Sequence, residues 1–111
     1  MTDYSFEFTH AITRRPARSV VDGLRAKDHG TPDFDQMLKD HAHYVATLRE
    51  TGAEIIELPA LDEFPDAVFV EDDALCLKNC AILMRPGAVS RMGEVAMIAP
   101  AIRAQYDDIS E

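Results

Sequence analysis

A run of carboxylate side chains without a neighbouring cation is the part of this chain best suited to chemistry. Between Pro59 and Leu77 there are six acidic residues and no Lys or Arg. Asp66, Glu71 and Asp72 bracket an apolar run, residues 67–70, which predicts a short buried strand. Carboxylates beside a buried strand lose hydration, and this loss is costly without a positive partner. We expect that partner to come from outside the segment, as a guanidinium, an ammonium group or a metal ion.

Glu71 and Asp72 fit a guanidinium in particular. Side chains alternate between the faces of a strand, so these neighbours reach one ligand only where the strand ends and the chain turns. Two carboxylates there can accept a planar guanidinium in a fork geometry. A divalent metal is the alternative, although the segment lacks the spacing of a calcium-binding loop. A solvated acidic loop is the third interpretation.

The other reactive side chains give weaker signals. Cys76 and Cys80 have no second pair with which to hold zinc, so we expect buried structural thiols and no metal site. His41 and His43 are two residues apart on a predicted helix and point to different faces. Arg91 follows a turn and opens a predicted helix, where it can face an anion or remain a surface cation. No phosphate-binding or cofactor motif is present, and no cofactor is expected.

Composition narrows the class of protein. The 111 residues predict a single domain, residues 1–111, and 47% of them are hydrophobic. A net charge of −9 argues against partners such as nucleic acid or an anionic membrane, since both require a basic surface. No apolar stretch reaches the length of a membrane span, and the first residues do not resemble a signal peptide. We therefore expect a cytoplasmic location.

Alternating strands and helices predict an α/β protein. The helix with the clearest signal follows Thr31 as N-cap and Pro32 as first helical residue, and Gly52 ends it. Its expected apolar stripe is Phe34, Met37, Leu38, His41, Tyr44, Val45 and Leu48. The other expected elements are strands over residues 5–12, 53–58 and 67–71, a long covering loop over residues 13–30, a hairpin of residues 74–78 and 80–85, and a helix over residues 91–105, capped by Ser90 and kinked or divided by Pro100.

Three ordered blocks of this chain resemble the N-terminal part of dimethylarginine dimethylaminohydrolases. They are Pro16-Ala-Arg-Ser-Val-Val-Asp-Gly-Leu24, Phe64-Pro-Asp-Ala-Val-Phe-Val-Glu-Asp72 and Arg85-Pro-Gly-Ala-Val-Ser-Arg-Met-Gly-Glu94. The resemblance implies a pentein-type α/β-propeller, with about two of five ββαβ modules present. It also implies hydrolysis of an Nω-methylated arginine to citrulline and a methylamine, through a covalent intermediate on a Cys thiolate with a His as acid and base.

The resemblance also implies roles for individual residues. Glu71 and Asp72 match the carboxylates that hold the substrate guanidinium. Asp66 and the backbone carbonyl of Leu24 match positions that take the α-amino group, and the loop around Leu24 matches a lid. Two further matches are Arg91, for the α-carboxylate, and Phe69, which lines the channel.

The nucleophilic Cys and the catalytic His of such enzymes belong to a C-terminal part that we expect to be missing here, so the chain alone is predicted to be inactive. Two alternatives remain: a non-catalytic half-propeller that binds an arginine-like cation or a partner chain, and a fragment of an arginine deiminase or amidinotransferase relative. An open propeller predicts association with itself or with the missing portion. The binding hypothesis requires that no arginine of the same chain neutralises Glu71 and Asp72.

Overall fold

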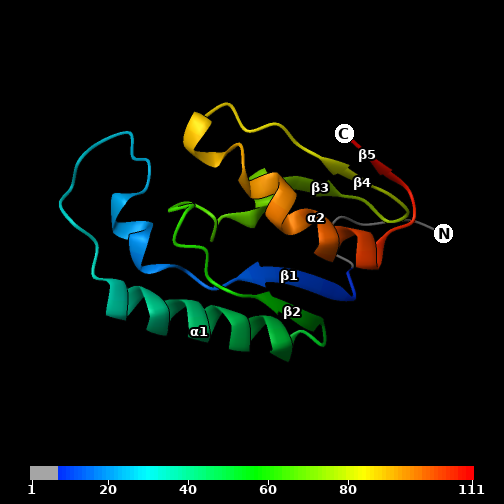
Figure 1. The fold of residues 1–111 in the computed structure, drawn as a ribbon. Coiled ribbons are helices and arrows are strands. Elements are labelled where there is room, and N and C mark those ends of the chain that lie inside the picture. The colour runs from blue at the N-terminus through cyan, green and yellow to red at the C-terminus, as the bar shows by residue number, and fades with distance from the viewer. Residues whose placement is uncertain (1–7) are drawn as a thin grey trace. The chain divides into compact units, whose positions relative to one another are not determined.

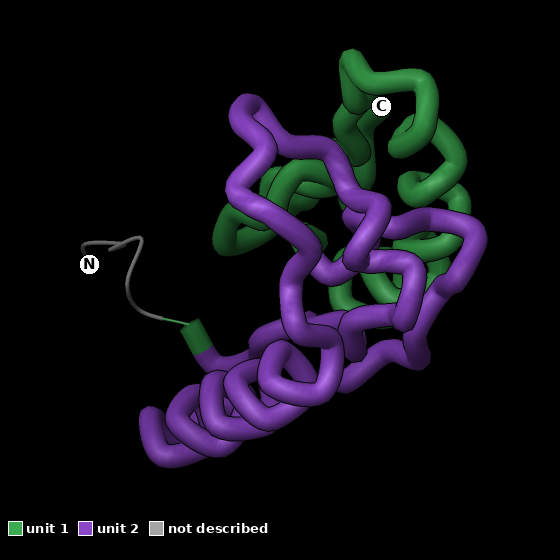
Figure 2. The backbone as a smooth tube through the Cα atoms, turned by 90° about the vertical axis from the view of Figure 1, so that its left-hand side faces the viewer, with its two compact units in different colours: residues 1–8, 69–111 green, residues 9–68 purple. Residues whose placement is uncertain are grey.

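A computed structural model describes residues 8–111, which form two compact units (Figure 1, Figure 2). One unit is Thr9–Val68, and the other contains Phe69–Glu111. Each unit combines helix and strand, so the predicted α/β class is confirmed. No helix within residues 8–111 is both long enough and apolar enough to cross a membrane.

The Thr9–Val68 unit is built on two parallel strands joined through a helix. Strand β1 (His10–Arg14) pairs with β2 (Glu54–Leu58), so that His10 lies opposite Glu54 and Arg14 opposite Leu58. Parallel strands need a long crossover, and helix α1 (Phe34–Glu50) lies within it and packs on β2 (Figure 1). The predicted strand over residues 5–12 therefore begins at His10 and extends two residues further, while residues 5–7 lie outside the described part.

Helix α1 starts later than predicted. Its N-cap is Asp33, whose carboxylate accepts a hydrogen bond from the Gln36 backbone N–H at 3.1 Å. The expected Thr31 cap and Pro32 start are therefore wrong, because Asp33 is the side chain that satisfies a free N–H of the first turn. The predicted end is confirmed: Thr51 is the C-cap, and Gly52 follows with φ +91°.

The apolar stripe of α1 is narrower than predicted. Val45 is buried, while His41 and Leu48 are half-buried on the same face. Tyr44 is 55% exposed and is not part of this stripe, which corrects the prediction. Burial lowers the pKa of His41, opposed by the Glu57 carboxylate, as expected for a partly buried core histidine.

The predicted covering loop contains a short 3-10 helix, η1 (Arg18–Asp22), anchored by buried Val20. Beyond it the backbone is held by a side chain rather than by a strand or helix. The Arg25 guanidinium donates hydrogen bonds to the carbonyl oxygens of Val21 and Gly30.

The Phe69–Glu111 unit contains one complete ββαβ module. Strands β3 (Ala74–Cys76) and β4 (Ala81–Leu83) form the predicted antiparallel hairpin. Helix α2 (Glu94–Gln105) packs on β4 and leads to β5 (Ile109–Ser110), which pairs with β4 in parallel. The sheet order is thus β3-β4-β5. Strand β5 was not predicted, since a two-residue strand leaves no periodic pattern.

The predicted buried strand over residues 67–71 is wrong. The segment forms turns followed by the 3-10 helix η2 (Val70–Asp72), closed by a hydrogen bond from the Asp73 N–H to the Val70 carbonyl at 3.1 Å. An apolar run of four residues fits a strand or a turn equally well, and here contacts from distant residues select the turn.

Helix α2 also departs from its prediction. Its N-cap is Gly93, and Ser90 lies in a separate 3-10 helix, η3 (Val89–Arg91). Pro100 stands inside α2 without dividing it. Buried Ile98, Ala99 and Ile102 hold this face of the helix in the core, which offsets the backbone hydrogen bond that proline removes.

Gly52→Ala should lower the free energy of unfolding by about 1 kcal/mol, because an L-residue is strained at positive φ. Added Cβ atoms meet nothing within 4 Å at Gly52 or at Gly87. Gly87 does not have a positive φ, so Gly87→Ala is the matched control. Urea unfolding of both variants measures the difference, and an equal loss at both positions would contradict this explanation of the α1 terminus.

Candidate ligand-binding site

The Arg91 guanidinium lies among three carboxylates in the Phe69–Glu111 unit. We call Arg91, Asp72, Asp73 and Glu94 the Arg91 cluster. Nε and Nη2 of Arg91 donate to the two carboxylate oxygens of Glu94 at 2.9 and 2.8 Å, in a bidentate fork. Nη1 donates to Oδ2 of Asp72 at 2.6 Å. Charge-assisted pairs of this geometry are among the strongest hydrogen bonds in proteins.

Short helices bring these residues together. Arg91 ends η3, and Glu94, three residues later, is the first residue of α2, where a negative charge also complements the helix dipole. Asp72 belongs to η2, whose N-cap residue Phe69 accepts a hydrogen bond from Nη2 of Arg91 through its carbonyl at 2.9 Å. The guanidinium therefore ties η2 to the start of α2.

Asp73 completes the cluster as a buried carboxyl group that is only 2% exposed. Its Oδ1 lies 3.9 Å from Nη2 of Arg91, beyond hydrogen-bond distance. The pKa of Asp73 is raised to about 7, first by burial and then by neighbouring Glu94, while the charge of Arg91 opposes the shift. The Asp73 carboxyl therefore takes up a proton at higher pH than an ordinary aspartate does.

The pairing of Asp72 contradicts one condition of the sequence hypothesis. An arginine of the same chain binds Asp72, so this carboxylate is not uncompensated. Glu71 is exposed, and no ion pair of its side chain is found among residues 8–111. The cluster still contains more carboxyl than guanidinium groups, since Asp72 and Glu94 bind the same arginine and Asp73 lies beside it. Asp72 keeps 56% of its side chain exposed, so it can still meet a second cation.

The position of Arg91 differs from that of a surface cation waiting for an anion. The residue is only 9% exposed, and its guanidinium is bound by Glu94, Asp72 and the Phe69 carbonyl. The Glu94 hydrogen bonds, followed by that of Asp72, raise the pKa of Arg91 above its ordinary value. Its visible role is to hold carboxylates, whereas the predicted contact with a ligand carboxylate is untested.

Two predicted residues meet in the Thr9–Val68 unit. The Leu24 backbone N–H donates to both carboxylate oxygens of Asp66, at 3.2 and 3.1 Å. Asp66 is buried, with 6% of its surface exposed, whereas Leu24 in the loop is 61% exposed. Gly23 lies against the same carboxylate: a Cβ added there would stand 2.6 Å from Oδ1 of Asp66. The loop backbone therefore orients the Asp66 carboxylate.

The remaining candidates are open to solvent to different degrees. Phe69 is 43% exposed, so its ring is available for contact. Cys76 is exposed and Cys80 half-buried, so the prediction of buried thiols is wrong for Cys76. Its local surroundings nevertheless raise the pKa of the Cys76 thiol by desolvation, opposed by a hydrogen bond with Tyr106. Residues 8–111 contain no group of three or more His, Cys, Asp or Glu placed to hold a metal.

Glu94 and Asp73 were not among the predicted site residues. The spacing Arg91-x-x-Glu94 is a signal for a helical ion pair, since residues three apart share a face. Nothing in the sequence reveals the burial of Asp73, which depends on packing between η2 and α2.

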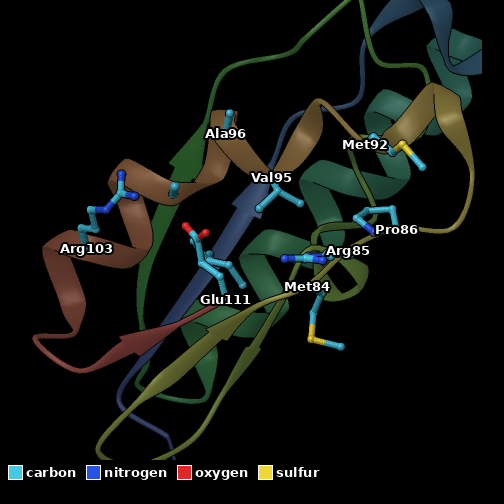
Figure 3. Close-up of a pocket in the computed structure, with 10 residues that line it drawn as sticks. Met84, Arg85, Pro86, Met92, Val95, Ala96, Arg103 and Glu111 are labelled. Carbon is cyan, nitrogen blue, oxygen red and sulfur yellow. The ribbon is translucent and has the colours of Figure 1, made fainter.

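A pocket of about 500 Å³ lies elsewhere in the same unit (Figure 3). Met84 and Pro86 line it from the segment after β4, Met92 lines it from the end of η3, and Val95 and Arg103 line it from α2. Glu71 and Asp72 are not among its lining residues, so the pocket is separate from the predicted cation-binding carboxylates.

Asp73→Asn should change how stability depends on pH. The folded-state pKa of Asp73, about 7, is above its ordinary value of 3.8, so the folded state binds the extra proton. Its contribution to stability is present below about pH 4 and is lost as the pH rises through about 7. Relative to Asp73→Asn, the wild type should lose roughly 1–4 kcal/mol between pH 4 and 8. Urea unfolding across this range tests the prediction, with exposed Asp107→Asn as control, and a pH-independent difference would contradict it.

Gly23→Ala should displace the Asp66 carboxylate, because the new methyl group overlaps Oδ1. The Leu24 amide would lose its acceptor, so its hydrogen exchange should become at least about tenfold faster. Gly87→Ala, which meets open space, should leave the rate unchanged. Unchanged Leu24 exchange in Gly23→Ala would show that Asp66 does not depend on this close approach.

Comparisons with known proteins identify the relatives of the chain. No protein-family model matches it. The chain is 46% identical over 99 residues to N(G),N(G)-dimethylarginine dimethylaminohydrolase of Pseudomonas aeruginosa, covering 89% of this chain and 39% of the relative. It is 38% identical over 98 residues to the protein of the same name from Streptomyces coelicolor, covering 83% of this chain and 36% of the relative. The chain thus spans about two fifths of the length of these curated relatives.

Solved structures of dimethylarginine dimethylaminohydrolases also match this chain. A Cys-to-Ser variant of the Pseudomonas aeruginosa enzyme, complexed with citrulline, matches with a TM-score of 0.92 and 43% identity over 95% of this chain and 42% of that chain. A His-to-Gly variant of a dimethylarginine dimethylaminohydrolase, in an adduct with S-methyl-L-thiocitrulline, also matches with a TM-score of 0.92 and 43% sequence identity. This match covers 94% of this chain and 41% of that chain. The fold is therefore of the pentein α/β type, and part of a propeller is present. In sequence and in fold, the chain resembles the N-terminal part of dimethylarginine dimethylaminohydrolases.

Proposed function

We propose that this chain is the substrate-binding portion of a hydrolase that acts on Nω-methylated arginine. The observation that carries the proposal is the excess of carboxylate over guanidinium in and beside the Arg91 cluster, in a chain similar to dimethylarginine dimethylaminohydrolases over nearly all of its length. We further propose that residues 1–111 are one portion of an α/β-propeller domain that associates with further polypeptide.

The ligand cation is assigned to Glu71 and Asp72. Arg91 holds one oxygen of Asp72, and the side chain is otherwise half-exposed beside exposed Glu71. A planar guanidinium can donate hydrogen bonds to two such carboxylates at once. A carboxylate already fixed by Arg91 loses less conformational entropy on binding, which favours affinity.

The α-amino group of the ligand is assigned to Asp66 and the Leu24 carbonyl. The Leu24 N–H already fixes the Asp66 carboxylate, and a buried carboxylate in a fixed orientation suits an ammonium group. Phe69 is assigned to apolar contact with the ligand. Arg91 is assigned to the ligand α-carboxylate, while its guanidinium also binds Glu94 and Asp72.

The thiols support a binding role rather than a catalytic one for this portion. A nucleophilic Cys needs a lowered pKa, and the surroundings of Cys76 raise it. Among residues 8–111, the titratable side chain that acts on the Cys76 thiol is Tyr106, which is not a general base at neutral pH. We therefore expect the 111-residue chain to bind methylarginine without producing citrulline.

Calorimetry with Nω,Nω-dimethyl-L-arginine and with citrulline tests the proposal. Citrulline retains the amino acid end but has no cation at the other end. The chain should bind dimethylarginine at least about tenfold more tightly, since each charge-assisted hydrogen bond contributes roughly 1.5–3 kcal/mol. Glu71→Gln should reduce this preference.

Asp107→Asn is the matched control, because it removes one exposed negative charge from the same unit. It should leave the ratio of the two affinities unchanged. Equal affinity for both ligands, or no binding by a chain whose fold is verified by circular dichroism, would refute the proposed cation site.

A further inference from the structure

The Arg91 cluster contains a buried acid that none of the assigned ligand contacts uses. Glu94 is 1% exposed, which is rare for a glutamate, and both of its oxygens bind Arg91. A buried charge is costly unless its geometry is well satisfied. The side chain is too enclosed to touch a ligand, so its contribution must pass through its neighbours.

We propose that Glu94 is a positioning residue for cation binding: it orients the Arg91 guanidinium, which in turn holds Asp72 in the orientation that receives the ligand cation. This inference rests on the proposed function and adds the support of Asp72 to the assigned role of Arg91.

The geometry of the Arg91 guanidinium supports this link from Glu94 through Arg91 to Asp72. The fork on Glu94 uses Nε and one hydrogen of Nη2, and this fixes the guanidinium plane. Within that plane Nη1 points at Oδ2 of Asp72, and the second hydrogen of Nη2 meets the Phe69 carbonyl. The same group therefore orients a side chain of η2 and the backbone at the start of η2.

Charge explains why an acid is needed behind Arg91. An unsupported buried guanidinium would attract Asp72 strongly and cancel its charge for any ligand. Glu94 supplies a full negative charge to Arg91, so the charge of Asp72 remains available to a second cation. The charged or titratable groups that act on Asp73 are Glu94 from α2, Arg91 from η3 and Asp72 from η2.

Glu94→Gln tests the proposal in the 111-residue chain. The amide keeps the shape of the side chain but places an N–H group against an arginine donor, so the fork is lost. Affinity for dimethylarginine should fall at least about tenfold, while affinity for citrulline stays within about twofold. A purely structural role would lower both affinities together.

A double-mutant cycle with Asp72→Asn identifies the route of the effect. If Glu94 acts through Asp72, the double variant should bind dimethylarginine no more weakly than Asp72→Asn alone. Glu50→Gln, the same substitution at an exposed site, is the control and should leave both affinities unchanged. Additive losses, or parallel losses for both ligands, would overturn the proposal.

A ligand-independent measurement separates this inference from the proposed function. The Arg91 Nε–H should exchange slowly in the wild type and at least about tenfold faster in Glu94→Gln. The carboxyl-carbon resonance of Asp72 should shift in the same variant. If the wild type binds neither ligand, the proposed function fails, and these two signals alone decide whether Glu94 positions Asp72. An unchanged Asp72 resonance would overturn the inference.

Arg91→Lys serves as a second variant should Glu94→Gln fail to fold. Lysine keeps the charge but cannot bridge Glu94 and Asp72 in a planar fork. It should reproduce the selective loss of dimethylarginine affinity, and retention of the wild-type preference would contradict the inference.

Discussion

The bidentate pair between buried Arg91 and Glu94 is the interaction on which the Phe69–Glu111 unit depends most. Two charges have been removed from water, and good geometry must compensate for that cost. The fork meets this requirement at the junction of η3 and α2. From there two further hydrogen bonds of the guanidinium reach Asp72 and the Phe69 carbonyl, so the pair holds the acidic segment at η2.

This arrangement gives the acidic residues unequal roles. Asp73 is buried and has a raised pKa, Asp72 is fixed by Arg91 but half-exposed, and Glu71 is exposed to solvent. Three adjacent carboxylates in one sequence thus have three different electrostatic environments. The difference arises from burial and from access to a single guanidinium. Only the outer two carboxylates are exposed, and these are the two to which we assign the ligand cation.

The Thr9–Val68 unit prepares a carboxylate by another route. Asp66 is oriented by a backbone N–H from a loop rather than by a charged side chain. Gly23 permits this approach because it has no Cβ to meet the carboxylate. The loop itself is held by Arg25 hydrogen bonds to its own carbonyl groups. Both units therefore fix an acid before any ligand arrives, one through a salt bridge and one through main chain.

The sequence by itself determined the α/β class, the end of α1 at Gly52, the β3–β4 hairpin and the family resemblance carried by its three blocks. These features depend on local periodicity, on a glycine at positive φ and on side chains in fixed order. Tertiary structure alone decided the turn at residues 67–72, the burial of Asp73 and the partner of Asp72. The partner of Asp72 is Arg91, about twenty residues further along the chain, and Coulomb attraction acts across space without leaving a pattern in sequence.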